Sequence, residues 1–124
     1  MIICITIPGK FESLNKYILE SKKQRGSWNG GNSMKQKDQR RIIQYIPSGV
    51  RLRNPVWIRY TYYEPNRKRD HDNVSGYFHK VFQDALVQAG VIPDDGWDDI
   101  VGYSDTFKVD RGRPRIEVEL EEVT

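Results

Sequence analysis

The sequence has little cysteine and histidine and no long hydrophobic run. Its one cysteine, Cys4, cannot form an intramolecular disulfide, which is typical of a protein kept in a reducing compartment. The two histidines, His71 and His79, lack zinc-ligand spacing, and a single cysteine excludes a cysteine-rich zinc site. No segment approaches the length of a membrane span, and residues 2–7 are too short for the apolar core of a signal peptide. We therefore expect a cytoplasmic protein that does not enter membranes.

Charge is nearly balanced, so its distribution along the chain is more informative than its total. The 124 residues carry 20 Lys and Arg against 17 Asp and Glu, a formal net charge of +3. Basic residues crowd residues 10–53 and 67–69, whereas acidic residues crowd residues 94–99 and the last few positions. A net charge this small does not by itself indicate nucleic-acid binding.

The apolar pattern predicts one α+β domain over residues 1–124, with a mixed β-sheet packed against two main helices. Strands are expected where apolar residues run together or alternate, at residues 2–7, 56–63, 100–109 and 115–121. A helix is expected from Ser33 to about Tyr45, and residues 10–20 read as a loop or a short helix. Residues 21–33 are polar, basic and glycine-rich, which predicts a mobile surface loop.

The second main helix is the clearest element. Its apolar residues follow the i, i+4, i+7, i+8 pattern of one buried stripe. They are Val74, Phe78, Val81, Phe82, Ala85, Leu86 and Ala89. Asp72 or Asn73 is a natural N-cap for this helix, and Gly90 is a natural residue just past its C-terminus.

Acidic residues stand at both ends of this helix. Asp70 and Asp72 precede it and, in an extended chain, would point to the same side. Asp94 and Asp95 follow it. Crowded carboxylates usually require a cation, and such hard oxygen ligands favour Mg²⁺ or Mn²⁺. The plainer alternatives are that Asp72 only caps the helix, that Asp70 pairs with an arginine, and that Asp94 and Asp95 form a solvated turn.

The two acidic pairs can meet only if the chain after the helix runs back along it. About eighteen helical residues at 1.5 Å each separate them. Residues 91–95 can begin that return but not complete it, unless the helix is shorter than predicted. The residues alone leave this question open.

Several basic and aromatic residues fit a polyanionic partner. The candidates for phosphate contacts are Lys16, Lys22, Lys23, Arg25, Arg67, Lys68 and Arg69. Trp28, Tyr17 and Tyr63 could stack on splayed bases, although packing is the commoner role. Lys80 lies opposite the apolar stripe, either as a solvated lysine or as a cation that stabilises charge on phosphate. His71, the middle residue of D-x-D, is expected to point away from both aspartates, and His79 is expected at the surface.

Taken in order, these residues resemble the RusA-type Holliday junction resolvases. The resemblance spans nearly the whole chain, and the ordered set is specific where D-x-D-N alone would not be. Its residues are Arg69-Asp70-His71-Asp72-Asn73, Lys80, Asp84-Ala85-Leu86, Ala89-Gly90 and Asp94-Asp95, with Ile7-Pro8 and Leu14-Asn15-Lys16-Tyr17 near the start. The chain departs from the family by extra length between Asn73 and Lys80 and by a reduced proline-rich opening.

The resemblance implies a homodimeric, Mg²⁺-dependent endonuclease that cuts four-way DNA junctions by paired nicks, with Mn²⁺ as a possible substitute. It implies that Asp70, Asp72 and Asp95 are the catalytic aspartates that hold the metal, with Asp94 beside them. The functional lysine of the family falls on Lys80, which the extra length moves by about one helical turn. Small resolvases of this kind are common in phages, so a bacterial or phage origin is expected.

Two other functions fit the same residues. The chain could be a non-catalytic DNA-binding module whose acidic cluster is only structural, or a nuclease that acts on other branched DNA or on RNA. Cleavage of a four-way junction with Mg²⁺ and with EDTA separates the first alternative from the resolvase, and a substrate panel separates the second.

Overall fold

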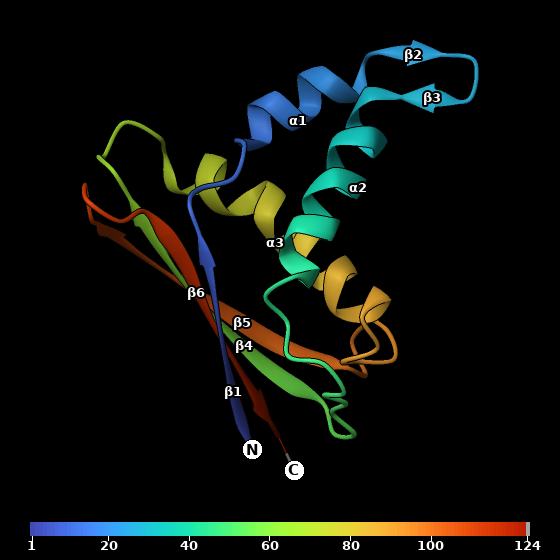
Figure 1. Cartoon of the computed structure of the whole chain (residues 1–124), viewed down its shortest axis with the longest axis vertical. Helices are drawn as coiled ribbons and strands as arrows, with labels where there is room; N and C mark the ends of the chain where they lie inside the picture. Colours follow the sequence, from blue (N-terminus) through green and yellow to red (C-terminus); the bar gives the residue numbers. More distant parts are fainter. Residues whose placement is uncertain (124) are drawn as a thin grey trace.

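The computed structural model describes residues 1–123 and has a four-stranded sheet, three helices and a small hairpin (Figure 1). The elements in chain order are β1 (Ile2–Pro8), α1 (Leu14–Ser21), β2 (Gln24–Arg25), β3 (Trp28–Asn29), α2 (Gly30–Ile43), β4 (Val56–Glu64), α3 (His71–Gln88), β5 (Ile100–Val109) and β6 (Arg115–Glu122). The predicted α+β class is confirmed, and residues 10–20, expected to be a loop or a short helix, contain all of α1 except its last residue.

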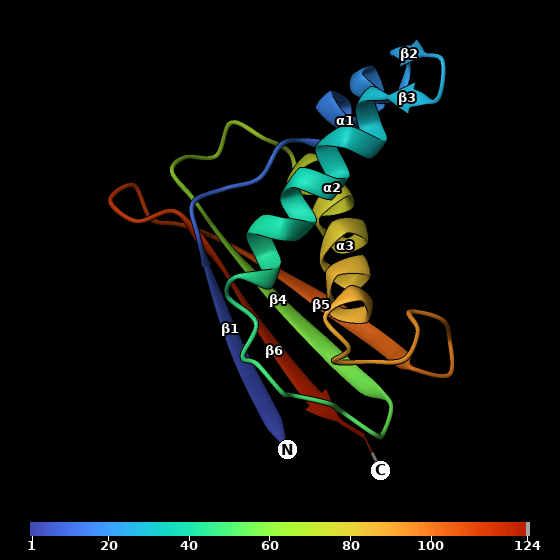
Figure 2. The same cartoon turned by 45° about the vertical axis from the view of Figure 1, so that its right-hand side comes forward.

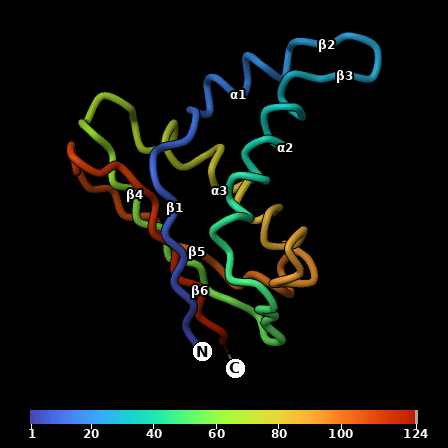
Figure 3. The backbone as a smooth tube through the Cα atoms, in the orientation of Figure 1, coloured from blue at the N-terminus to red at the C-terminus, as the bar shows by residue number. Residues whose placement is uncertain are grey.

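The sheet is mixed, as predicted, with strand order β1-β6-β4-β5. β4 and β5 are parallel, with Val56 opposite Ile100 at one end and Glu64 opposite Val109 at the other. The other two pairings are antiparallel, and the start of β1 lies beside the end of β6 (Figure 3). Because β4 and β5 run in the same direction, α3 must carry the chain back along the whole length of the sheet between them. β5 is therefore both an edge strand and the end of a crossover.

The three helices lie on the same face of the sheet (Figures 1 and 2). Along β4, Ile58, Tyr60 and Tyr62 are fully buried under the helices, while the intervening residues are half-buried on the other face. The predicted apolar stripe of α3 supplies the opposing layer, and only Ala89 of that stripe is exposed. The buried face of the strand, which repeats every two residues, and the apolar stripe of the helix, which repeats about every 3.6 residues, thus pack into one core.

The ends of α3 differ slightly from the prediction. The N-cap is Asp70 instead of Asp72 or Asn73, and its side chain makes no capping hydrogen bond. Gly90 follows the helix with a φ of +77°, as its predicted position requires. The helix therefore contains Asp72 in its first turn, where a carboxylate interacts favourably with the helix dipole.

Residues 21–33, expected to be a loop, form the β2–β3 hairpin and the first turn of α2. α2 begins at Gly30, not at Ser33, because the Asn29 side chain caps it by accepting a hydrogen bond from the Asn32 N–H at 3.0 Å. Gly31 has no Cβ, and a Cβ there would come within 2.1 Å of Ser21 Oγ. The start of α2 can therefore press directly onto the end of α1.

None of the helices in residues 1–123 has both the length and the apolar character needed to cross a membrane.

Candidate active site

An open depression of about 1020 Å³ lies where β4 ends and α3 begins. Its lining includes Asp70 and Asp72 together with the cationic Arg67 and Lys108. The end of β5 reaches the same place because Val109 pairs with Glu64. The depression therefore combines carboxylates, which can bind a cation, with cationic side chains, which can bind an anion.

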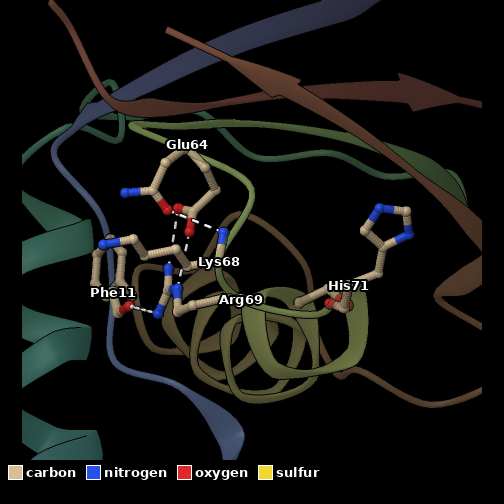
Figure 4. Close-up of polar contacts among 7 residues, drawn as sticks. Phe11, Glu64, Lys68, Arg69 and His71 are labelled. Atoms are coloured by element: carbon tan, nitrogen blue, oxygen red, sulfur yellow. Dashed lines mark hydrogen bonds and ion pairs between the residues drawn. The ribbon is translucent and has the colours of Figure 1, made fainter. Parts of the chain in front are cut away.

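Arg69 holds the loop that carries these carboxylates (Figure 4). Its Nε and Nη2 donate to the two carboxylate oxygens of Glu64 at 2.8 and 2.9 Å, and its Nη1 donates to the Phe11 carbonyl at 2.8 Å. Three of the five guanidinium N–H groups are thus used inside the protein. Arg69, expected among the phosphate contacts, is engaged in positioning the loop and in neutralising Glu64.

Asp70 and Asp72 are both exposed. Within residues 1–123, neither carboxylate has a hydrogen-bond or ion-pair partner, and neither caps α3 through its side chain. The plainer interpretations of the pair, a cap and an arginine partner, are therefore not seen. Two neighbouring carboxylates that face solvent without partners are available as oxygen ligands for a cation.

His71 lies between them in sequence but is turned away from the Arg69–Glu64 pair (Figure 4). Its ring stacks on Phe107 of β5, with centroids 3.9 Å apart and planes nearly parallel at 1°. Packing between α3 and β5 therefore explains the position of the His71 ring.

Asp95 lies at the opposite end of α3, beside Asp84. Burial, together with the hydrogen bond and negative charge of Asp84, raises the pKa of the Asp95 carboxyl above its ordinary value. Asp84 also forms an ion pair with Lys35 of α2, at 3.0 Å. Asp94 accepts a hydrogen bond from the Asp95 N–H at 2.8 Å. Asp95 thus belongs to a small charged cluster with α2 and α3.

The two acidic pairs do not meet within one chain. Asp72 and Asp84 are twelve residues apart on α3, which is about 18 Å along the helix axis. After α3, the chain enters β5 at the far end of the sheet instead of returning along the helix. Within residues 1–123 no three His, Cys, Asp or Glu side chains are gathered closely enough to hold a metal ion. The approach of Asp95 to Asp70 and Asp72 that the resemblance implied is therefore absent from the single chain.

Lys80 is exposed on α3 between these two ends. It is eight residues from Asp72 and four from Asp84, about 12 Å and 6 Å along the axis. Lys80 is thus nearer, along the axis, to the charged cluster than to the depression.

His79, expected at the surface, is partly buried against β5. Its Nε2 lies 2.7 Å from Asp105 Oδ1, and Tyr62 donates a hydrogen bond to the same oxygen at 3.0 Å. The helical pattern could not reveal this pair because Asp105 comes from a strand distant in sequence. The only signal was the position of His79 beside the apolar stripe.

The predicted phosphate contacts fall into two groups. Lys16 and Lys23 both pair with Glu20, at 3.2 and 2.9 Å. Their hydrogen bonds lower the pKa of Glu20, and the bond from Lys23 has the larger effect. Within residues 1–123, the remaining four cations outside the Arg69 pair are exposed and have no ion-pair partner. They are Lys22, Arg25, Arg67 and Lys68.

The three aromatic candidates for base stacking also differ in their surroundings. Tyr17 packs on Tyr77, with ring centroids 4.9 Å apart. Tyr63 is covered by the Arg115 guanidinium, 3.7 Å from its ring centroid. Trp28 is 46% exposed. The two tyrosine rings are therefore engaged within the protein, whereas nearly half of Trp28 faces solvent.

Comparison with known families supports the same assignment as the residue pattern. Residues 16–121 match the family described as Endodeoxyribonuclease RusA. A search of curated proteins found no match. The matched range begins within α1 and includes both acidic pairs and all but one residue of the last strand. The chain therefore belongs to the RusA family of endodeoxyribonucleases.

Proposed function

We propose that this protein is a Mg²⁺-dependent endonuclease that resolves four-way DNA junctions by paired, symmetric nicks. The observation that carries the proposal is a pair of exposed carboxylates, Asp70 and Asp72, which have no partner among the described residues and lie in a depression that Arg67 also lines. Membership of a family of endodeoxyribonucleases supports the reaction class.

The donor set of the depression fits a hard divalent cation. Asp70 and Asp72 would supply carboxylate oxygens to Mg²⁺, or to Mn²⁺ as a substitute. A bound ion supplies Lewis acidity and lowers the pKa of a coordinated water. Arg67 and Lys68 would hold the phosphodiester near the two aspartates, and Lys80 would balance negative charge as the bond is cut. Arg69 would act indirectly, because its bonds to Glu64 and Phe11 hold the loop in place.

Asp95 would come from a second copy of the chain. β5 is an edge strand, so its outer backbone groups are free to pair. If two β5 strands pair antiparallel about a twofold axis, the Ile100 end of one lies beside the Val109 end of the other. The acidic segment after α3 then reaches the level of the partner's depression. Asp95 and Asp94 of the partner subunit would complete the ligand set begun by Asp70 and Asp72.

Exposed apolar side chains support this edge as the dimer interface. Trp97, in the segment before β5, is 97% exposed, and Val101 and Tyr103 of β5 are each 49% exposed. That segment lies on the β5 side of the sheet (Figure 2). Covering these side chains with a second copy would remove apolar surface from water. Two sites related by a twofold axis would then face the two strands of a roughly twofold junction, which accounts for paired nicks.

The test is cleavage of a labelled four-way junction, compared with linear duplex of the same sequence and with a branched RNA. We expect Mg²⁺-dependent cuts at symmetric positions in the junction, none in EDTA, and little cleavage of the duplex. Equal cleavage of junction and duplex would contradict the resolvase function but leave a nuclease. Binding without cleavage in Mg²⁺ or Mn²⁺ would instead identify a non-catalytic DNA-binding module.

A further inference from the structure

The β2–β3 hairpin presents Trp28 on its surface at the end of the molecule remote from the sheet (Figure 1). Its indole contributes to two depressions, one between α1 and α2 and a smaller one on the hairpin itself. Within residues 1–123, no other aromatic ring packs against it. Nearly half of this large ring faces solvent, and aromatic packing does not explain its position.

The hairpin is anchored at its base. The Asn29 amide donates hydrogen bonds to the Ser21 carbonyl at 3.0 Å and to Gln24 Oε1 at 2.8 Å, and the Gly30 N–H donates to the Lys23 carbonyl at 3.0 Å. Gly26, with a φ of +58°, makes the turn at its tip. These bonds attach the hairpin to the end of α1, so Trp28 is held in place before any ligand binds.

Cationic side chains line the same two depressions as Trp28. The depression between α1 and α2 contains Lys37 and Arg40, and the depression on the hairpin contains Arg25. Within residues 1–123, none of these three forms an ion pair. Three acids line the larger depression, against five lysines and arginines. Glu20 is already paired with two lysines, Asp38 accepts a hydrogen bond from the Tyr77 hydroxyl, and Glu12 is outnumbered by the cations. Net positive charge therefore remains on both sides of the ring.

We propose that Trp28 stacks on an unpaired base of branched DNA, while Arg25, which pairs with Trp28 in the hairpin, contacts a phosphate beside that base and Lys37 and Arg40 contact phosphates farther along the strand. An aromatic face between cations is the arrangement that binds unstacked nucleotides without reading their sequence. A continuous duplex keeps its base faces stacked and cannot offer one to the indole, whereas a branch point can. The hairpin thus discriminates branched from linear DNA, an inference that rests on the proposed function.

The position of the hairpin agrees with a single bound junction. α1 begins beside α3, where the Asn15 N–H donates to Asn73 Oδ1 at 3.2 Å, and it extends about 12 Å to the hairpin. A base on Trp28 would therefore lie at least ~12 Å from the level of Asp72, which is roughly four steps of 3.4 Å along a DNA strand. We expect the cut strand to be nicked a few nucleotides from the branch.

The inference is tested by DNA binding in EDTA, where no cleavage occurs. Trp28→Ala should weaken binding of a four-way junction by roughly fivefold or more, and Trp28→Phe, which keeps a ring, should retain most of the affinity. Neither change should alter duplex affinity. Tyr45→Ala removes a similarly exposed ring elsewhere on the surface and should have no effect.

A second arm replaces the nucleotides at the branch point by abasic sites. Without a base to stack on, wild-type protein and Trp28→Ala should bind this junction equally, because the two changes remove the same contact. Equal loss of junction and duplex affinity in Trp28→Ala, equal weakness of the Phe variant, or an undiminished difference on the abasic junction would each overturn the inference. A protein that shows the Trp28 effect but never cuts DNA would refute the nuclease and leave the inference intact.

Discussion

The two ends of α3 carry similar acidic residues in different states. At the N-terminal end, Asp70 and Asp72 face solvent and have no partner within residues 1–123, next to the loop held by Arg69. At the C-terminal end, burial and the neighbouring Asp84 raise the pKa of Asp95, and Asp84 is itself paired with Lys35. Carboxylates without partners are ready to take a cation, whereas in the C-terminal cluster Lys35 balances the charge of Asp84, and the negative charge of Asp84 disfavours the ionised form of Asp95. About 18 Å of helix keeps Asp72 and Asp84 apart, so joining the ends requires a second molecule.

The largest expected effect comes from the N-terminal end of α3. Asp70→Asn and Asp72→Asn each remove a charged ligand, and we expect junction cleavage to fall by about a thousandfold or more because metal-ion catalysis is worth several kcal/mol. Junction binding should be kept or improved, since a negative charge near the DNA is lost. Single-turnover cleavage and binding in EDTA measure the two quantities. Asp98→Asn, in the segment after α3, is the control and should cleave normally.

The next largest effect is expected from a substitution on β5 and not from one on β1, the other edge strand of the sheet. Val101→Asp puts a charge on the proposed interface, and we expect a monomer whose cleavage is reduced about a hundredfold because each site lacks its third carboxylate. Sedimentation velocity and cleavage measured on one preparation report both changes. Ile2→Asp alters a 57% exposed residue of β1, the opposite edge strand, and should leave dimer and activity unchanged. Dissociation by Ile2→Asp alone would move the interface to β1.

A smaller effect is expected at Lys80, between the two ends. Lys80→Gln should slow cleavage by about 10- to 100-fold without weakening junction binding, because the charge acts on the transition state. Lys80→Arg keeps the charge and should recover part of the rate. Equal losses in binding and cleavage would show that Lys80 is only a phosphate contact.

The smallest expected effect is on stability, and it concerns the loop before α3 that Arg69 holds. Arg69→Lys keeps the charge but loses the two-pronged contact with Glu64, and we expect it to lower the free energy of unfolding by about 1–3 kcal/mol. Arg67→Lys, two residues away and exposed, should change it by less than about 0.5 kcal/mol. Urea unfolding measures both. Equal stability of the two variants would contradict the anchoring role of Arg69.

Local patterns were enough to predict most of the fold. The alternation in β4 and the stripe in α3 depend on neighbouring residues, and both elements form close to the predicted bounds. The hairpin escaped prediction because two-residue strands have no periodicity. Its stability comes from Asn29, whose amide reaches Ser21, a contact with no sequence pattern.

The site was predictable only in part. The acidic pairs were visible in the sequence, but the engagement of Arg69 with Glu64 and Phe11 depends on where β4 and the segment before α1 meet in space. The separation of Asp95 from Asp70 depends on the parallel pairing of β4 with β5, which makes α3 cross the full sheet. Contacts between distant segments decided both outcomes.

The central claim is that each active site takes Asp70 and Asp72 from one subunit and Asp95 from the other. Its most direct test is a mixed dimer of Asp70→Asn and Asp95→Asn chains, purified through two different tags. Each variant alone should cleave at least about a hundredfold more slowly than the wild type, whereas the mixed dimer contains one intact site and should nick one strand of the junction at close to the wild-type rate per site. If Asp95 served its own chain, both sites of the mixed dimer would be damaged. An inactive mixed dimer that still binds the junction would therefore contradict the account.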